Sequence, residues 1–333
     1  MYEIAKLPSE EREILFQNTA ARLGMNSAII EKDFWVCLTL DYLFHHCKWK
    51  QAFAFKGGTS LSKIYGLIDR FSEDIDLILD WRTVGYSYHE PWEERSNTQQ
   101  QKFIEESEKR VFCYLKEEFL PVFRAELAKL ISTDINVYID DDDPGTVKFA
   151  YPRTFENASI LQEIRLEIGA LAAWTPTQYA DIRSYAAECY PSVFRQASTT
   201  ILTTTAERTF WEKATILHQE AYRPEKSKVP ERYSRHYYDL YCMANKGILE
   251  KAMLQGDLLI QVAAFKRKFY PRQWARYEEA RIGTLKLIPA SHSIDRLRSD
   301  YARMKAMIYG EYPDFDVIMS FIADLEQKIN VGK

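Results

Sequence analysis

One stretch near the start of the chain fits a single local arrangement, in which a strand, a glycine turn, a helix and a second strand follow one another. Residues 52–55 (Ala-Phe-Ala-Phe) predict a short buried strand, and the two glycines at 57–58 predict a turn. The next two residues, Thr59 and Ser60, predict the capped first turn of a helix. Residues 75–79 predict a second strand. Such a succession favours a β-sheet with helices packed against it.

The rest of the chain divides into a mixed part and a helical part. Helices are predicted near the amino terminus, in a long central stretch and beyond Thr203, at residues 1–48, 97–131, 205–222 and 234–245. Further strands are predicted at residues 135–139, 147–151 and 161–168. We therefore expect an α/β (α+β) fold in two domains, residues 1–200 with a helical lead-in and residues 201–333.

Composition narrows the class of protein. The five cysteines show no spacing typical of a disulfide framework or a zinc site, which favours a reducing compartment. The amino terminus has no export signal, and no apolar run approaches the roughly 20 residues of a membrane helix. A net charge of −4 excludes a uniformly basic nucleic-acid binder but allows a local basic face. We expect a cytoplasmic protein without a membrane segment.

Asp74 and Asp76 are the residues with the clearest chemical meaning. Alternate residues on a strand point to the same face, so the two carboxylates converge while Ile75 and Leu77 enter the core. Paired carboxylates attract Mg²⁺, which can bridge triphosphate oxygens. A solvated strand end is the alternative for an isolated Asp-x-Asp. The glycine turn and helix start just upstream, a pattern typical of phosphate sites, favour a metal–nucleotide site.

Five short blocks together resemble a known group of enzymes. Residues 55–60 (Phe-Lys-Gly-Gly-Thr-Ser) and 71–77 (Phe-Ser-Glu-Asp-Ile-Asp-Leu) look like the signature of the polymerase-beta-type nucleotidyltransferases. The narrower resemblance is to the AbiEii/MenT toxin family. It rests also on residues 30–35 (Ile-Glu-Lys-Asp-Phe-Trp), 208–213 (Arg-Thr-Phe-Trp-Glu-Lys) and 235–241 (Arg-His-Tyr-Tyr-Asp-Leu-Tyr). No block after residue 245 matches.

The resemblance implies a fold, cofactors and site residues. It implies a polymerase-beta-like nucleotidyltransferase core with a mixed sheet, and a helical carboxyl-terminal domain that completes the active-site cleft. The substrate would be a nucleoside triphosphate, with Mg²⁺ or Mn²⁺ bound by Asp74 and Asp76. Catalytic roles are implied for Asp74, Asp76, Lys213 and Asp239. Nucleotide contacts are implied for Lys56, Gly57, Gly58, Thr59, Ser60, Ser72 and Lys213.

Lys213 and Asp239 can also be judged from their own surroundings. On a helix, Lys213 flanks the apolar stripe of Phe210 and Leu217, so its ammonium can reach a cleft and grip a β- or γ-phosphate. Packing along the core, or pairing with a nearby acid, is the alternative. A buried Asp239 needs a partner. It is either a structural partner of Lys213 or Arg235, or a residue that activates the acceptor or positions Lys213.

Three other residues are weaker candidates. Glu167 belongs to a strand that can lie beside Asp74 and would supply a third metal carboxylate, unless that face is simply polar. Lys32 and Asp33 fall in a block of the family resemblance, whereas a surface ion pair would explain them equally well. Asp140–Asp143, before Pro-Gly, lacks the ligand spacing of a calcium loop and predicts a solvated hairpin turn.

A nucleic-acid acceptor would need a basic surface, and two segments qualify. Residues 223–235 carry Lys226, Lys228 and Arg232, and residues 266–276 interleave cations with aromatic residues that can stack on bases. Solvated faces of packed helices are the alternative for the second segment.

The family resemblance implies the toxin of a toxin–antitoxin or phage-defence pair, with a separate antitoxin protein. In some members tRNA is the acceptor, so our first hypothesis is transfer to tRNA or another RNA. The second hypothesis is a small-molecule nucleotidyltransferase of the antibiotic-modifying type. The third is a nucleotide-binding regulator without catalysis.

Overall fold

The computed structural model describes residues 1–72, 74–157, 160–172 and 175–332. The chain forms two compact units. The first, called here the α/β unit, consists of Met1–Ile64 and Glu73–Thr203. The second, called here the helical unit, consists of Tyr65–Ser72 and Thr204–Lys333. Residues 65–72 thus belong to the helical unit, although in the order of the chain they come between two strands of the α/β unit. No sequence pattern indicates this assignment.

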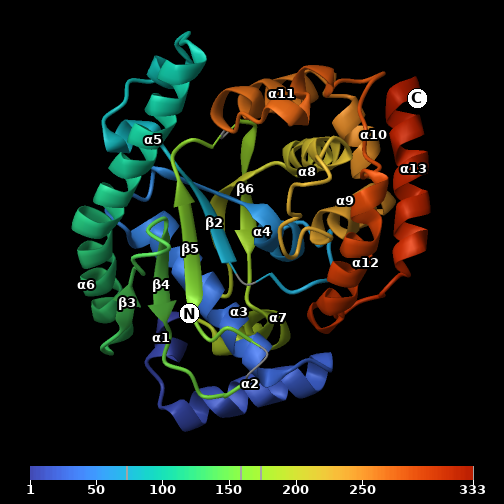
Figure 1. Cartoon of the computed structure of the whole chain (residues 1–333). Helices are drawn as coiled ribbons and strands as arrows, with labels where there is room; N and C mark the ends of the chain where they lie inside the picture. The colour runs from blue at the N-terminus through green and yellow to red at the C-terminus, as the bar shows by residue number, and fades with distance from the viewer. Residues whose placement is uncertain (73, 158–159, 173–174, 333) are drawn as a thin grey trace. The chain divides into compact units, whose positions relative to one another are not determined.

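The α/β unit contains a seven-stranded sheet in the order β3-β4-β5-β2-β1-β7-β6 (Figure 1). Its strands are β1 Phe53–Lys56, β2 Asp74–Leu79, β3 Asn136–Tyr138, β4 Thr146–Ala150, β5 Ile164–Gly169, β6 Thr177–Ile182 and β7 Thr199–Thr204. Strand β1 pairs antiparallel with β2 and parallel with β7. Strand β2 pairs parallel with β5, and β5 pairs antiparallel with β4. Parallel and antiparallel pairs occur together, which confirms the predicted α/β fold with a mixed sheet.

One face of this sheet is apolar and covered by helices. Ile75 and Leu77 of β2 are buried, as are Ile164 and Leu166 of the neighbouring β5. Aromatic contacts join this face to the helices, because Trp35 meets Phe149, and Phe119 meets Phe53. Alternation then turns Asp74, Asp76, Arg165 and Glu167 to the opposite face.

The helices of the α/β unit lie before and between its strands. They are α1 Tyr2–Ala5, α2 Ser9–Leu23, α3 Ser27–Asp41, α4 Gly57–Lys63, α5 Asn97–Tyr114, α6 Leu120–Ile131 and α7 Tyr185–Cys189, with π-helical turns η1 Tyr42–His46 and η4 Leu115–Phe119. Helices α5, η4 and α6 follow without a break, which confirms the long helix predicted over residues 97–131. Trp35 lies on α3 and Phe119 on η4, so both elements cover the apolar face.

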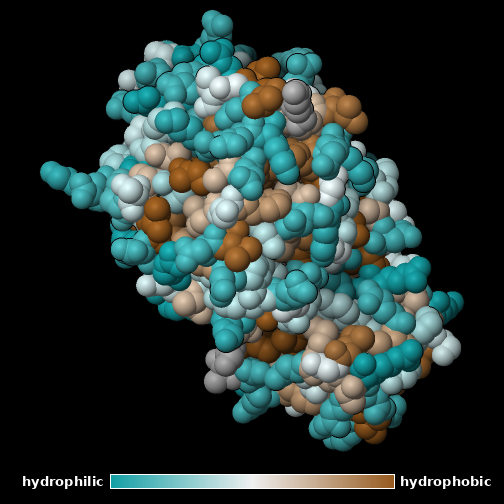
Figure 2. Space-filling view, turned by 90° about the vertical axis from the view of Figure 1, so that its right-hand side faces the viewer, coloured by the Kyte–Doolittle hydropathy of each residue, from teal (hydrophilic) through white to brown (hydrophobic). Residues whose placement is uncertain are grey.

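The helical unit is arranged around one central helix. Its helices are α8 Ala206–Ala221, α9 Arg235–Asn245, α10 Ile248–Met253, α11 Gly256–Phe269, α12 Ile294–Arg303 and α13 Phe315–Val331. Helix α8 packs against α9, α10 and α11, and α13 packs on α9. The face drawn in Figure 2 is mainly hydrophilic with small, separate apolar areas. In the described part of the chain, no helix has the length and apolarity required to cross a membrane.

The sequence analysis did not predict strands β6 and β7, because neither shows a clear alternation of apolar and polar side chains. Strand β6 lies at one edge of the sheet, and its side chains are largely exposed, so no apolar alternation marks it. Strand β7 is built mainly of threonine, whose pattern does not separate a buried face from an exposed one. Its neighbour β1 identifies it as part of the sheet through the Phe55–Thr203 pair.

Candidate functional site

Asp74 and Asp76 lie at the start of β2 on one face of the sheet. Both side chains are half-buried, whereas Ile75 and Leu77 between and after them are buried. The predicted alternation is therefore confirmed. Lys56, the last residue of β1, is the register partner of Asp76. The glycine pair and the carboxylates thus lie at the same end of the neighbouring strands β1 and β2.

Gly57 touches the Asp76 carboxylate directly. Its φ is +85°, and a Cβ at this position would lie 1.8 Å from Asp76 Oδ2 and 2.6 Å from Asp76 Cγ. No other residue fits without moving the carboxylate, and the left-handed conformation itself favours glycine. A ligand bound by the Asp76 carboxylate would therefore lie close to the Gly57 backbone. The glycine turn and the acidic pair, predicted to meet, are in contact.

Gly57→Ala should lower the nucleotidyl transfer that the family resemblance implies by about 10²-fold, because a displacement of about 1 Å in an active site has effects of that size. The matched control is Gly24→Ala in the same unit. Gly24 also has a left-handed φ of +64°, but nothing lies within 4 Å of an added Cβ. Initial rates and thermal unfolding of both variants separate backbone strain from displacement of Asp76. Equal activity of the two variants would contradict a role for this contact.

Helix α4 begins earlier than predicted. The two glycines form its first turn, Lys56 is the residue before it, and no side chain caps it. Thr59 and Ser60 are buried within the helix: Thr59 Oγ1 donates to the Asp74 carbonyl at 2.6 Å, and Ser60 Oγ donates to the Gly57 carbonyl at 2.9 Å. The predicted capping role is wrong, because the Thr59 hydroxyl ties α4 to the start of β2 and the Ser60 hydroxyl bonds within α4. Nucleotide contact by this turn would fall on its backbone.

A second strand adds charge to the same face. Glu167 of β5 is the register partner of Asp76, and Arg165 is that of Asp74, so Glu167 lies on the predicted neighbouring strand. The Arg165 guanidinium lies among three carboxylates. Its Nη2 is 3.0 Å from Asp143 Oδ2 and 3.8 Å from Glu167 Oε1, and its Nε is 3.9 Å from Asp74 Oδ1. No local sequence pattern indicates these contacts of Arg165.

The acidic hairpin is only partly the solvated turn that was predicted. Strands β3 and β4 do form the hairpin, and Asp141 and Asp142 are exposed. Asp143, however, is half-buried and accepts hydrogen bonds from Arg165 and from Thr146 Oγ1. Asp143 therefore belongs to the charged face. Its distance in sequence from Arg165 and from Asp74 hid that relation.

The donor set suits a divalent cation that also binds a substrate. Asp74 Oδ1 is buried and accepts no hydrogen bond, so it has an unused lone pair on the face that carries Asp76. Among the described residues, no three His, Cys, Asp or Glu side chains gather into a group that could hold a metal. Mg²⁺ commonly takes one or two carboxylates and fills its remaining positions with water and phosphate oxygens. The two aspartates fit that pattern, and Glu167 as a third ligand stays a prediction.

The helical unit holds a buried cluster of two cations and one carboxylate. Lys213 Nζ of α8 lies 2.7 Å from Asp239 Oδ2 of α9. Arg70 binds the same carboxylate in two places, with Nε 2.7 Å from Oδ1 and Nη2 2.8 Å from Oδ2. All three side chains are buried. Of the partners predicted for Asp239, Lys213 is present, and Arg70 binds the carboxylate as well.

The electrostatics of this cluster are set by burial and by its own charges. Burial lowers the pKa of the Lys213 ammonium, and Asp239 only partly restores it. For Asp239, burial would raise the pKa of the carboxyl, but Arg70 and Lys213 together hold it below its ordinary value. Asp239 therefore stays ionised and fixes both cations. Arg70 was missed because nothing in its local sequence indicates a partner so far along the chain.

Lys32 and Asp33 are not a surface ion pair. Both are buried in α3, and Lys32 Nζ donates to the Leu161 carbonyl at 2.6 Å. Asp33 pairs instead with Lys63 Nζ at 2.8 Å and accepts a hydrogen bond from the Tyr185 amide. Because Lys63 is the last residue of α4, Asp33 anchors the helix that begins with the two glycines.

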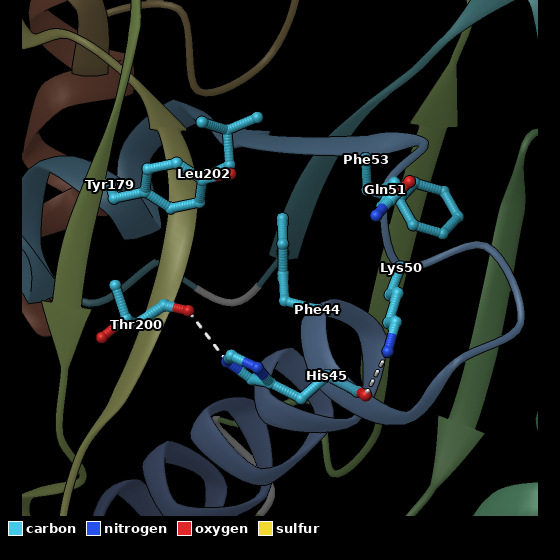
Figure 3. A pocket seen from close by; sticks show the side chains of 8 residues that line it. All are labelled: Phe44, His45, Lys50, Gln51, Phe53, Tyr179, Thr200 and Leu202. Atoms are coloured by element: carbon cyan, nitrogen blue, oxygen red, sulfur yellow. Dashed lines mark hydrogen bonds between the residues drawn. The ribbon is translucent and has the colours of Figure 1, made fainter.

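A cavity of about 420 Å³ lies near the other end of β1 (Figure 3). Its lining is Phe44, His45, Lys50, Gln51, Phe53, Tyr179, Thr200 and Leu202. His45 Nε2 lies 2.8 Å from the Thr200 carbonyl across it. Phe53 begins the strand that Lys56 ends, and none of the lining residues is a predicted site residue. The cavity is thus separate from the acidic pair.

Comparison with known proteins identifies the family. Residues 41–325 match the family described as "Nucleotidyl transferase AbiEii toxin, Type IV TA system". No curated protein matches the chain. Two solved structures are similar over most of their length: JHP933 from Helicobacter pylori and MenT4, a nucleotidyltransferase toxin from Mycobacterium tuberculosis H37Rv.

JHP933 is 16% identical with a TM-score of 0.43, covering 91% of this chain and 92% of its own. MenT4 is 15% identical with a TM-score of 0.44, covering 96% of this chain and 94% of its own. The family match spans most of the chain. The chain is therefore a nucleotidyltransferase that belongs to the AbiEii family of type IV toxin–antitoxin systems.

Proposed function

We propose that the protein is a metal-dependent enzyme that transfers a nucleoside monophosphate from a nucleoside triphosphate to an RNA acceptor, with tRNA the first candidate. The observation that carries the proposal is the contact between Gly57 and the Asp76 carboxylate, with Asp74 on the same face. Triphosphates need a backbone that they can approach closely and a cation that neutralises their charge. Both requirements meet at this edge of the sheet.

Each proposed site residue of the α/β unit has a defined task. Asp74 and Asp76 hold Mg²⁺ or Mn²⁺, with Glu167 as a third carboxylate. The bound cation would polarise the α-phosphorus and stabilise the departing pyrophosphate. The backbone of Gly57 and Gly58 accommodates the phosphates, and Lys56 adds a positive charge beside them. Thr59 fixes α4 to β2, so that the glycines and aspartates keep their spacing.

From the family resemblance, we propose cations of the helical unit as contacts for the phosphates or the acceptor. Lys213 is the phosphate-binding ammonium, and Asp239 orients it through the 2.7 Å ion pair. Arg70 shares the same carboxylate, so Asp239 aligns two positive groups at once. Ser72 follows Arg70 by two residues in the same unit and is proposed as a nucleotide contact.

The basic segments support an RNA acceptor. Lys226, Lys228 and Arg232 are exposed in the loop between α8 and α9. The guanidinium of Arg223, in the same loop, lies 4.9 Å from the Trp274 ring, and that of Arg272 lies 5.8 Å from it. The two segments are therefore neighbours. Arg223 is itself buried and paired with Glu220, so the exposed cation at the half-buried Trp274 ring is that of Arg272. An exposed cation beside an aromatic ring suits unpaired nucleotides.

The packing alternative is correct for part of the second segment. Phe269 is buried, and Lys266 Nζ donates to the Glu212 carbonyl at 2.8 Å, so this end of α11 serves the core. Arg272 and Arg276 beyond the helix are exposed. The proposed RNA contact is accordingly limited to the loop after α8 and to the residues around Trp274.

Transfer of label tests the proposal. The protein is incubated with each of the four α-labelled nucleoside triphosphates and total tRNA, or with small hydroxyl compounds. We expect label on tRNA with native protein and none with Asp76→Ala. Label on small compounds alone would establish the antibiotic-type reaction instead. Nucleotide binding without pyrophosphate release would establish a regulator without catalysis.

The family assignment implies an antitoxin partner. We further propose that the enzyme acts in the cytoplasm as part of a phage-defence system. Nucleoside triphosphates and tRNA are both found in that compartment. The five cysteines are free thiols, which agrees with a reducing compartment.

A further inference from the structure

Arg165 occupies the position that a cation would take on the acidic face. Its guanidinium lies within 4 Å of carboxylate oxygens from Asp74, Asp143 and Glu167. Of these three contacts, the hydrogen bond to Asp143, at 3.0 Å, is the shortest. The hairpin between β3 and β4 thus ties Arg165 down on the side away from β2.

The gap between Arg165 and Asp74 is unusual. Asp74 Oδ1 and Arg165 Nε are both buried, face each other at 3.9 Å, and make no hydrogen bond. Buried donors and acceptors normally find partners, because leaving them unpaired costs free energy. An arginine and an aspartate this near to each other would ordinarily form a hydrogen bond. On its other side, the same guanidinium donates the 3.0 Å hydrogen bond to Asp143.

We propose that Arg165 is a resident counter-ion that competes with the divalent metal for Asp74 and Glu167, and that Asp143 sets the strength of this competition. This inference rests on the proposed metal site. Without a metal, Arg165 offsets the repulsion among the carboxylates. The positive charge of Arg165 would oppose that of a metal held by the same carboxylates, so Arg165 would lower the metal affinity until the charge of a triphosphate is added.

The consequence is ordered binding. Arg165 would weaken the binding of a bare divalent ion by the free enzyme, and the negative charge of a nucleoside triphosphate would outweigh this guanidinium. Arg165 is a specificity-determining residue in this scheme, because it favours the metal–nucleotide complex over the bare ion.

Titration with Mn²⁺ in the absence of nucleotide tests this role, with free Mn²⁺ measured by electron paramagnetic resonance. Arg165→Gln should bind Mn²⁺ at least about tenfold more tightly than native protein, since a like charge is removed from the site. Arg165→Lys keeps the charge and should stay near the native affinity. Arg153→Gln is the control, because Arg153 is an exposed arginine of the same unit paired with Glu156. It should leave the affinity unchanged.

Asp143→Asn should have the opposite effect, because Arg165 is then released towards Asp74. We expect severalfold weaker Mn²⁺ binding, and we expect that effect to vanish when Arg165→Gln is also present. Unchanged or weaker binding by Arg165→Gln, with a native circular dichroism spectrum, would overturn the inference. If Asp76→Asn left Mn²⁺ binding of the native protein intact, the proposed metal site itself would fail. The two failures are therefore distinguishable.

Discussion

Replacing Asp76 with asparagine should lower nucleotidyl transfer by roughly 10³-fold, since metal assistance of several kcal/mol corresponds to about tenfold for each 1.36 kcal/mol. Asparagine has the shape of aspartate, so the close packing of this side chain on Gly57 is retained. The fold should therefore survive, while the charge that holds the cation is lost. Rates of pyrophosphate release from native protein and variant measure the effect.

Asp141→Asn is the matched control for this substitution. Asp141 is an exposed carboxylate of the same unit, on the hairpin next to Asp143. Its removal changes the net charge equally but leaves the acidic face intact, so activity should stay within about twofold of native. Comparable losses in both variants would show that Asp76 acts only through the overall charge.

Replacing Asp239 with asparagine should destabilise the helical unit by about 3–5 kcal/mol, because the variant leaves Arg70 and Lys213 buried without a counter-charge. The matched control is Asp69→Asn. Asp69 belongs to the same unit and pairs with Lys246 at 3.2 Å, but both side chains are substantially exposed. An exposed pair contributes about 0–1 kcal/mol, so this control should change little. Urea titration followed by circular dichroism measures both.

A second substitution separates stability from function. Lys213→Met removes one of the two stranded cations, so the Asp239→Asn, Lys213→Met double variant should regain part of the lost stability. It should not regain activity, since Lys213 is the proposed phosphate ligand. Recovered transfer in the double variant would remove Lys213 from the mechanism.

The same cluster predicts a pH dependence of stability. The folded pKa of Asp239 is depressed below its ordinary value of 3.8, so the folded state binds this proton more weakly than the unfolded state. The stabilisation is then fully present above that value and is lost as the pH falls through the folded pKa. The difference in stability between native protein and Asp239→Asn should hold from neutral pH to about pH 4 and shrink only below it.

The acidic pair could be predicted because the features that indicate it lie within one short segment of the sequence. Alternation within one strand fixes the shared direction of Asp74 and Asp76, and the adjacent glycines restrict what the preceding turn can be. The hairpin at residues 139–145 was predictable for the same reason, since turn residues and flanking strands lie within one short segment.

The residues that surround the pair could not be predicted, because they depend on strand order and on contacts distant in sequence. Arg165 comes near Asp74 through the pairing of β5 with β2, and Asp143 comes near Arg165 through the pairing of β4 with β5. Arg70 binds Asp239, which lies 169 residues further along the chain. The start of α4 was misjudged because Thr59 satisfies the Asp74 carbonyl, a tertiary bond that overrides its local preference for a cap.

Crystallography of the protein with Mn²⁺ and a non-hydrolysable nucleoside triphosphate tests the metal site most directly, because anomalous scattering locates the ion. We expect an Mn²⁺ peak within about 2.5 Å of carboxylate oxygens from both Asp74 and Asp76, with the phosphates against the backbone of Gly57 and Gly58. A triphosphate and ion bound elsewhere, such as in the cavity of Figure 3, with both aspartates unliganded, would contradict the assignment.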